Sequence, residues 1–94
     1  MRYRKNEIDF DKCRCKEIEV FQYQGNFDND TPEWITKALN NGELRYDDNG
    51  MLYVNYYNLD VKVGYYICLK LPTRGYGDIT AFPEEFLNEY YDKI

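Results

Sequence analysis

The stretch over residues 31–57, TPEWITKALNNGELRYDDNGMLYVNYY, contains the strongest local signals in the chain and decides the fold. Its first part predicts a helix over 32–40, because Thr31 can cap a helix and Pro32 suits the first helical position. Gly42 can take the left-handed conformation in which helices commonly end. The apolar residues of this part form a single stripe: Trp34, Ile35, Ala38 and Leu39. We therefore expect one amphipathic helix that packs on a sheet.

The second part of this stretch changes to an alternating pattern. Residues 44–46 and 51–57 are rich in residues that favour strands, and Asn49-Gly50 between them can take the positive φ angles of a tight hairpin. The sequence therefore predicts a β-hairpin directly after the helix.

Outside this stretch the sequence predicts the remaining elements of one sheet. We expect strands over 17–23, 61–71 and 79–81, a turn over 58–60, a loop over 72–78 and a last helix over 83–91, with Gly64 as a bend or bulge. The expected fold is a single small α+β domain over 1–94. It has a mainly antiparallel sheet of about four to five strands and two short helices, at about 32–40 and 83–91.

Composition excludes several classes of chemistry. The chain has 94 residues and no histidine, so it has no imidazole for general-base catalysis near neutral pH and no nitrogen ligand for zinc. The acidic pairs Asp47-Asp48 and Glu84-Glu85 are explained by turn chemistry and by the helix dipole. No apolar run reaches the roughly 20 residues of a membrane span. We expect a soluble cytoplasmic protein that is not an enzyme and uses no cofactor.

The three cysteines are an odd number, and two of them stand close together. Cys13 and Cys15 would share one face of a strand, where they could not easily form a disulfide, while Cys68 is far away in sequence. A metal site needs about four ligands. The sequence favours reduced thiols and no metal site.

Charge is distributed unevenly along the chain. Residues 1–16 hold six basic and three acidic residues, a net charge of +3, whereas the formal charge of the whole chain is −5 and that of residues 17–94 is therefore −8. An acidic body without Lys/Arg clusters is not expected to bind nucleic acid directly. The pattern favours a basic leader over 1–16 with frayed first residues, ahead of an acidic domain.

The loop before the last strand contains a short glycine motif. Arg74-Gly75-Tyr76-Gly77-Asp78 includes Gly-x-Gly, which could approach a phosphate with Arg74 adding positive charge and Tyr76 an aromatic ring. Asp78 would oppose that phosphate, and the motif lacks further glycine or lysine. An ordinary turn is the favoured interpretation.

Tyrosines are the other candidate binding residues, since the chain has 11 of them. Tyr56-Tyr57 and Tyr65-Tyr66 are consecutive pairs on predicted strands, so one member of each pair must face away from the other. If the helices cover one face of the sheet, the opposite face could present tyrosines to a protein partner or a base. Solvent-facing tyrosine without function is an equally good interpretation.

Several motifs together resemble a family of small phage and prophage proteins of Gram-positive hosts. These motifs are IEVFQYxG at 18–25, TPEWI at 31–35, NG at 41–42, LYV at 52–54, GYYI at 64–67 and PxxFxxxY at 83–90. The resemblance covers about residues 15–91. It implies an accessory protein that acts in the host cytoplasm, and it assigns no catalytic residue.

From this resemblance and the acidic charge we expect a non-enzymatic counter-defence factor, anti-CRISPR-like or similar. It would bind and inhibit a host protein, such as a nucleic-acid-handling defence protein, through acidic residues and tyrosines. One alternative is a sponge that sequesters a signalling nucleotide near Arg74 and Tyr76. Another is a structural or regulatory phage protein that acts as a homodimer or higher homo-oligomer. The candidate binding residues are Tyr56, Tyr57, Tyr65, Tyr66, Arg74, Tyr76 and Asp78.

Overall fold

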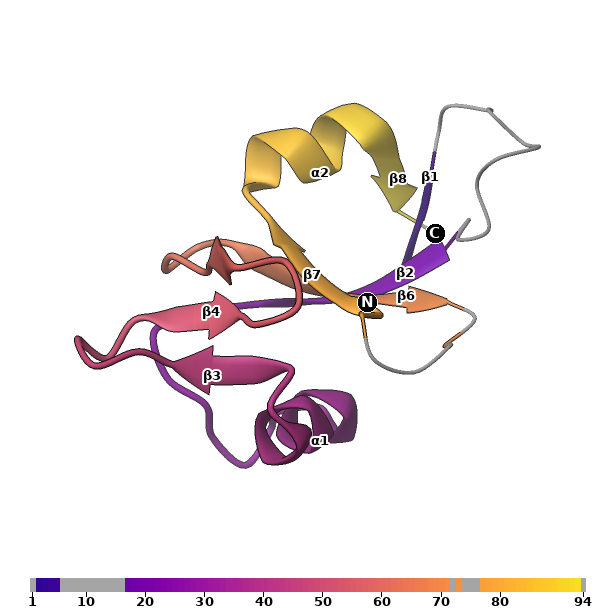
Figure 1. Ribbon diagram of the computed structural model, residues 1–94. Helices are drawn as coiled ribbons and strands as arrows, with labels where there is room; N and C mark the ends of the chain where they lie inside the picture. The colour runs from indigo at the N-terminus through magenta and orange to yellow at the C-terminus, as the bar shows by residue number, and fades with distance from the viewer. Residues whose placement is uncertain (1, 6–16, 72, 74–76, 94) are drawn as a thin grey trace.

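Two helices are set among short strands in the computed structural model, which describes residues 2–5, 17–71, 73 and 77–93 (Figure 1). In chain order the elements are β1 (Arg2–Lys5), β2 (Glu17–Gln22), α1 (Glu33–Asn41), β3 (Leu44–Tyr46), β4 (Leu52–Val54), β5 (Leu59–Asp60), β6 (Tyr66–Leu71), β7 (Ile79–Phe82), α2 (Glu84–Tyr90) and β8 (Tyr91–Lys93).

The strands form two antiparallel sheets. The larger has the order β7-β6-β2-β1-β8 and the smaller the order β3-β4-β5. With two short helices this is the α+β fold that the sequence predicts, although the strands are more numerous than expected. No helix in the described part of the chain is long and apolar enough to cross a membrane.

Both faces of the larger sheet are covered. Side chains alternate along a strand, so Ile18 and Val20 of β2 face one side while Phe21 and Tyr23 face the other. Figure 1 shows α2 above the sheet and the smaller sheet with α1 below it. The molecule therefore has three layers, and its core is divided into two parts.

The two parts of the core are separate clusters of buried side chains. Cluster 1 lies between the sheets and α1, and contains Tyr23, Ile35, Ala38, Leu44, Leu52, Val54, Val61, Ile67, Ile79 and Ala81. Cluster 2 lies under α2 and contains Tyr3, Ile18, Val20, Cys68 and Leu87. The second cluster is the smaller one, so α2 is held by few apolar contacts.

The helix and hairpin at the centre of the sequence form as predicted, with one change at the helix start. Gly42 has a φ of 85° and ends α1 in the left-handed conformation. Pro32 is the N-cap and no side chain caps the helix; instead Thr31 Oγ1 accepts a hydrogen bond from the Asp28 N–H at 3.0 Å. In the hairpin, Asp47 Oδ1 accepts the N–H groups of Asn49 and Met51, both at 2.9 Å.

The segment between β4 and β6 differs from its prediction. Residues 55–58 form a turn, with Asn58 at a φ of 51°, and the expected turn over 58–60 is largely the short strand β5. Residues 61–65 are not strand, because Gly64 has a φ of 95° and its N–H donates to the Tyr23 carbonyl. β6 therefore starts only at Tyr66.

The two ends of the chain meet in the larger sheet. Residues 2–5 form β1 rather than a frayed end, and β1 pairs with β2 on one side and with β8 on the other. The last helix stops at Tyr90 because Tyr91 is extended, with φ −133° and ψ 145°. The rest of the leader, residues 6–16, lies outside the described residues, as do Cys13 and Cys15.

Cys68 is fully buried in cluster 2 and is a free thiol. Its Sγ donates a weak hydrogen bond to the Tyr66 carbonyl at 3.4 Å. Burial raises the pKa of the Cys68 thiol well above its ordinary range. Burial also raises the pKa of Tyr23, and the nearby Tyr46 phenol raises it further. Burial likewise raises the pKa of Tyr66, and Glu84 and Tyr3 add to that increase.

These shifts predict that the protein loses stability at alkaline pH. The unfolded Cys68 thiol ionises at about pH 8.5, below the pKa of the folded thiol, so the free energy of unfolding falls as the pH rises past that value. Above about pH 10 the two tyrosines add to the loss. We expect the urea midpoint to fall between pH 8 and pH 10, and to fall less in Cys68→Ala. Equal losses in wild type and variant would contradict the assignment to Cys68.

Candidate functional site

The seven residues that the sequence singles out do not form one site. Arg74 and Tyr76 lie outside the described residues. Tyr56 and Tyr57 are exposed in the turn after β4. Tyr66 is the first residue of β6 and Tyr65 directly precedes it, while Asp78 is buried just before β7.

The two tyrosine pairs do not share one face of the sheet, which was one of the two interpretations that the sequence left equally open. Tyr65 packs against cluster 1 and Tyr66 against cluster 2, so each covers a different core. Tyr56 and Tyr57 stand in a turn rather than on a strand, with their rings edge to face at 4.8 Å. Because both faces of the larger sheet are covered, it has no open face to present.

Tyr57 instead holds the loop before β7. Its hydroxyl donates to the Gly77 carbonyl at 2.9 Å and accepts from Lys70 Nζ at 2.6 Å. The N–H group of the same residue, Gly77, donates a hydrogen bond to Glu43 Oε1 at 3.3 Å. Gly77 is thus held between β6, the turn after β4 and the residue before β3. These contacts give Gly77 a structural role that does not require a bound phosphate.

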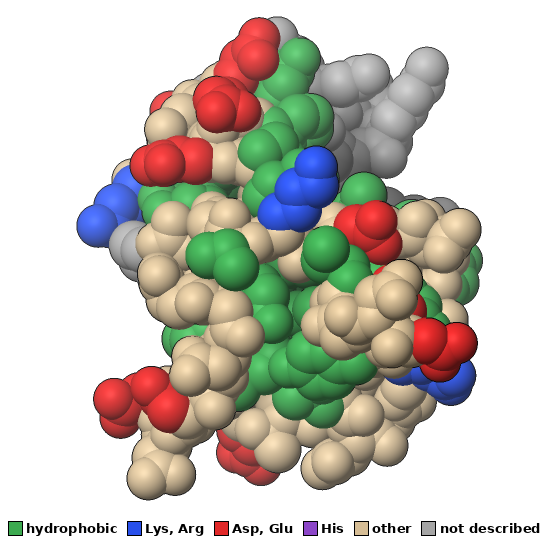
Figure 2. Space-filling model, turned by 90° about the vertical axis from the view of Figure 1, so that its left-hand side faces the viewer, with side chains coloured by type: hydrophobic (Ala, Val, Ile, Leu, Met, Phe, Trp, Pro, Cys, Tyr) green, Lys and Arg blue, Asp and Glu red, His purple; other side chains and the backbone are tan. Residues whose placement is uncertain are grey.

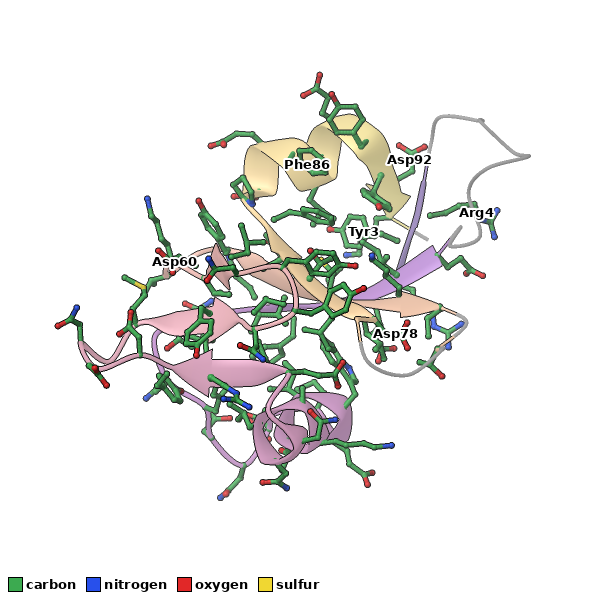
Figure 3. All side chains as sticks on the ribbon, in the orientation of Figure 1. Tyr3, Arg4, Asp60, Asp78, Phe86 and Asp92 are labelled. Carbon is green, nitrogen blue, oxygen red and sulfur yellow. The ribbon has the colours of Figure 1, made fainter. Side chains whose placement is uncertain are left out.

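One concave site lies between α1 and this loop, and we call it the α1 pocket. It has a volume of about 230 Å³ and is lined by Trp34, Lys37, Asn41, Glu43, Leu69, Thr73, Asp78 and Ile79. Figure 3 shows Asp78 at this end of the molecule. The pocket combines two carboxylates, one ammonium group, an indole ring and two aliphatic side chains.

A second concave site lies at the opposite end, and we call it the hairpin groove. It has a volume of about 320 Å³ and is lined by Tyr23, Gly25, Asn49, Gly50, Met51, Leu52, Val61, Lys62 and Val63. Two apolar side chains at the groove are unusually exposed, Met51 at 38% and Val63 at 66%. Figure 2 shows an apolar area at the centre of this face, with both acidic and basic side chains around it.

The acidic residues beside the hairpin groove come from turns and short strands. Asp47 and Asp48 are exposed in the hairpin turn that leads to Met51, and Asp60 is exposed at the end of β5, next to Val61 (Figure 3). An apolar patch with a polar rim is typical of a protein-binding surface.

Of the seven predicted binding residues, only Asp78 lines one of these two sites, the α1 pocket, and the sequence analysis did not single out the other lining residues as binding residues. Trp34 was assigned to the core stripe of α1, yet it is only partly buried and lines the α1 pocket. The sequence predicts strand for the segments of Met51 and Val63, yet both residues lie outside the strands, next to Gly50 and Gly64, which have positive φ angles. Gly50 and Gly64 were the signal in the sequence that could have pointed to turns at the hairpin groove.

No group of three or more histidine, cysteine, aspartate or glutamate residues within the described ranges could hold a metal ion.

The structure thus defines a small α+β domain in which the α1 pocket and the hairpin groove are separate concave sites. A scan against family models and searches of curated proteins and solved structures found no match.

Proposed function

We propose that the protein acts by binding another protein, without catalysis, and that the hairpin groove is the binding surface. The observation that carries this proposal is the pair of exposed apolar side chains, Met51 and Val63, at a groove with carboxylates beside it. Exposed apolar side chains gain stability when a partner removes them from water, at about 25 cal/mol for each Å².

The charge of the protein indicates a basic partner. The formal charge is −5. The groove is lined by one charged residue, Lys62, but Asp47, Asp48 and Asp60 are exposed and close in sequence to its lining residues. Complementary charge speeds association and makes it sensitive to salt. Proteins that bind nucleic acid carry basic surfaces, so the partner class is a nucleic-acid-handling protein whose binding surface this protein occupies.

The resemblance to small phage proteins extends the proposal to its context. In that context the partner is a host defence protein and the site of action is the host cytoplasm.

A nucleotide sponge is less well supported by the geometry. Glu43 and Asp78 are buried beside the α1 pocket, and both carboxylates would repel a phosphate there. The hairpin groove is mainly apolar and has carboxylates beside it.

Affinity capture from host lysate with three baits tests this proposal. Wild-type protein should retain a basic protein at low salt and retain less of it as salt rises. Val63→Asp places a charge in the apolar part of the groove and should weaken binding of that protein at least tenfold, as loss of an interface anchor does. Asn88→Asp adds the same charge to the exposed face of α2 and should bind as wild type does. Equal capture by all three baits, or no capture at low salt, would refute the proposal.

A further inference from the structure

The chain contains two Asn-Gly pairs, and the fold places them in different surroundings. Asn41-Gly42 ends α1, whereas Asn49-Gly50 lies in the turn between β3 and β4. Asparagine before glycine is especially prone to spontaneous deamidation, because glycine has no Cβ to hinder its backbone nitrogen as it approaches the asparagine amide. Both asparagines are exposed, and the φ angles of the two glycines are similar, at 85° and 81°. Exposure and backbone conformation therefore do not distinguish the two pairs.

The side-chain amide of Asn41 is held by hydrogen bonds at both of its ends. Its Nδ2 donates to Glu43 Oε2 at 2.8 Å, and its Oδ1 accepts from the Glu43 N–H at 3.0 Å. Glu43 is itself buried and also accepts from the Gly77 N–H. To react, the Asn41 amide would have to leave these partners and approach the Gly42 nitrogen. Because α1 packs on cluster 1, its end opens fully only when buried contacts are also lost.

The side-chain amide of Asn49 is not held in this way. No hydrogen bond of this side chain is found among the residues that the structure describes. The turn is closed by Asp47, whose carbonyl accepts from the Gly50 N–H at 3.0 Å and whose Oδ1 accepts from the N–H groups of Asn49 and Met51. The attacking nitrogen is thus occupied until the turn opens. Since all four of these residues are exposed, the turn can open while cluster 1 stays packed.

We propose that Asn49 is a site of spontaneous deamidation in the folded protein, and that Asn41 is protected from the same reaction. When the turn opens, the Gly50 nitrogen attacks Cγ of Asn49. The new N–Cγ bond replaces the bond from Cγ to the amide nitrogen, which takes up the proton of the Gly50 nitrogen and leaves as ammonia. Water then opens the resulting succinimide ring at either carbonyl, and the product is aspartate or isoaspartate.

Either product adds a carboxylate to the hairpin groove. Asn49 lines that groove, and the one charged residue in its described lining is Lys62. Isoaspartate also carries the main chain through the former side-chain methylene, which lengthens the turn next to Met51. The reaction needs no partner, so the inference stands apart from the proposed function. For a partner that binds at the groove, fresh and modified protein present different charges.

Peptide mass spectrometry follows the two sites separately, because trypsin cleavage after Arg45 puts Asn41 and Asn49 in different peptides. Fragment ions then distinguish Asn49 from Asn55 and Asn58. In folded protein kept at mildly alkaline pH, Asn49 should convert at least tenfold faster than Asn41. This ratio requires a difference of only about 1.4 kcal/mol in the free energy of opening. In guanidinium chloride at the same pH the two rates should agree within about threefold, because the fold no longer protects either site.

Two variants test the role of the turn. Asp47→Ala removes the carboxylate that holds two N–H groups of the turn, and should raise the rate at Asn49 at least twofold. Asp48→Ala removes the same charge from the neighbouring exposed residue and should leave the rate unchanged. Each rate is compared with that of the same variant in guanidinium chloride. An unchanged rate in Asp47→Ala would overturn the role given to the turn.

The comparison of the two sites in wild-type protein needs no variant, so it decides the proposal whatever the stability of Asp47→Ala. Conversion of Asn41 and Asn49 at equal rates in the folded protein would overturn the proposal. So would conversion of Asn49 that occurs only after unfolding in guanidinium chloride.

Discussion

Replacing Leu87 by alanine is expected to lower the free energy of unfolding by about 2–5 kcal/mol, the usual cost of truncating a buried leucine. Leu87 is 0% exposed and is the buried residue of α2, so it is the main apolar contact between that helix and cluster 2. A helix of seven residues is not stable without packing. Since β8 follows α2 directly and pairs with β1, loss of this contact also weakens the edge of the larger sheet.

Urea unfolding at neutral pH measures this loss, and Asn88→Ala is the matched control. Asn88 is the next residue of α2 and is exposed, so its replacement should change the free energy of unfolding by no more than about 0.5 kcal/mol. Similar unfolding midpoints for Leu87→Ala and Asn88→Ala would show that α2 does not depend on cluster 2.

Replacing Gly77 by alanine is expected to cost more than the backbone strain alone. Gly77 has a φ of 100°, which residues with a side chain rarely adopt, and holding such a residue there costs about 1–3 kcal/mol. An alanine Cβ would also lie 3.3 Å from the Tyr56 ring. Movement away from that ring would disturb the hydrogen bonds of Gly77 to Tyr57 and Glu43.

The variant Gly64→Ala measures the cost of backbone strain at a positive φ without a close contact to an aromatic ring. Gly64 has nearly the same φ, 95°, but an added Cβ would meet nothing within 4 Å. We therefore expect Gly77→Ala to lower the free energy of unfolding in urea by more than Gly64→Ala does. If the two losses were equal, the packing of Tyr56 on Gly77 would contribute nothing.

Local signals in the sequence predict the centre of the fold well. α1 and the β3–β4 hairpin depend on residues close in sequence, such as Gly42 at the helix end and Asp47 in the hairpin turn. These contacts form wherever the rest of the chain lies, so the sequence pattern is sufficient to find them.

Elements that depend on distant partners were not predictable in the same way. β8 exists because β1 offers an edge to pair with, and nothing in the three residues Tyr91–Lys93 distinguishes them from the end of a helix. For β1 the sequence predicts frayed first residues, because the basic residues around Tyr3 give no sign that its side chain is buried. Strand pairing over such distances is a tertiary effect that local propensity does not contain.

The candidate sites illustrate the same division. At Gly77 the sequence favours a structural turn over a phosphate site because Asp78 opposes an anion, and the hydrogen bonds of Gly77 to Tyr57 and Glu43 are consistent with that interpretation. Sequence reasoning could not find the α1 pocket, since Trp34 and Glu43 become neighbours of Asp78 only when α1 packs beside the loop before β7. The places of the tyrosine pairs differ from the predicted strands because Asn58 and Gly64 have positive φ angles, and the chain turns where alternation predicts strand.

Hydrogen–deuterium exchange on the captured complex tests the central claim most directly, because it locates the binding surface without a mutation. If the protein binds its partner through the hairpin groove, backbone amides over residues 49–52 and 61–64 should exchange more slowly in the complex than in the free protein. The amides of α2 should be unchanged. Protection confined to α2 and β8, with none at the groove, would contradict the account.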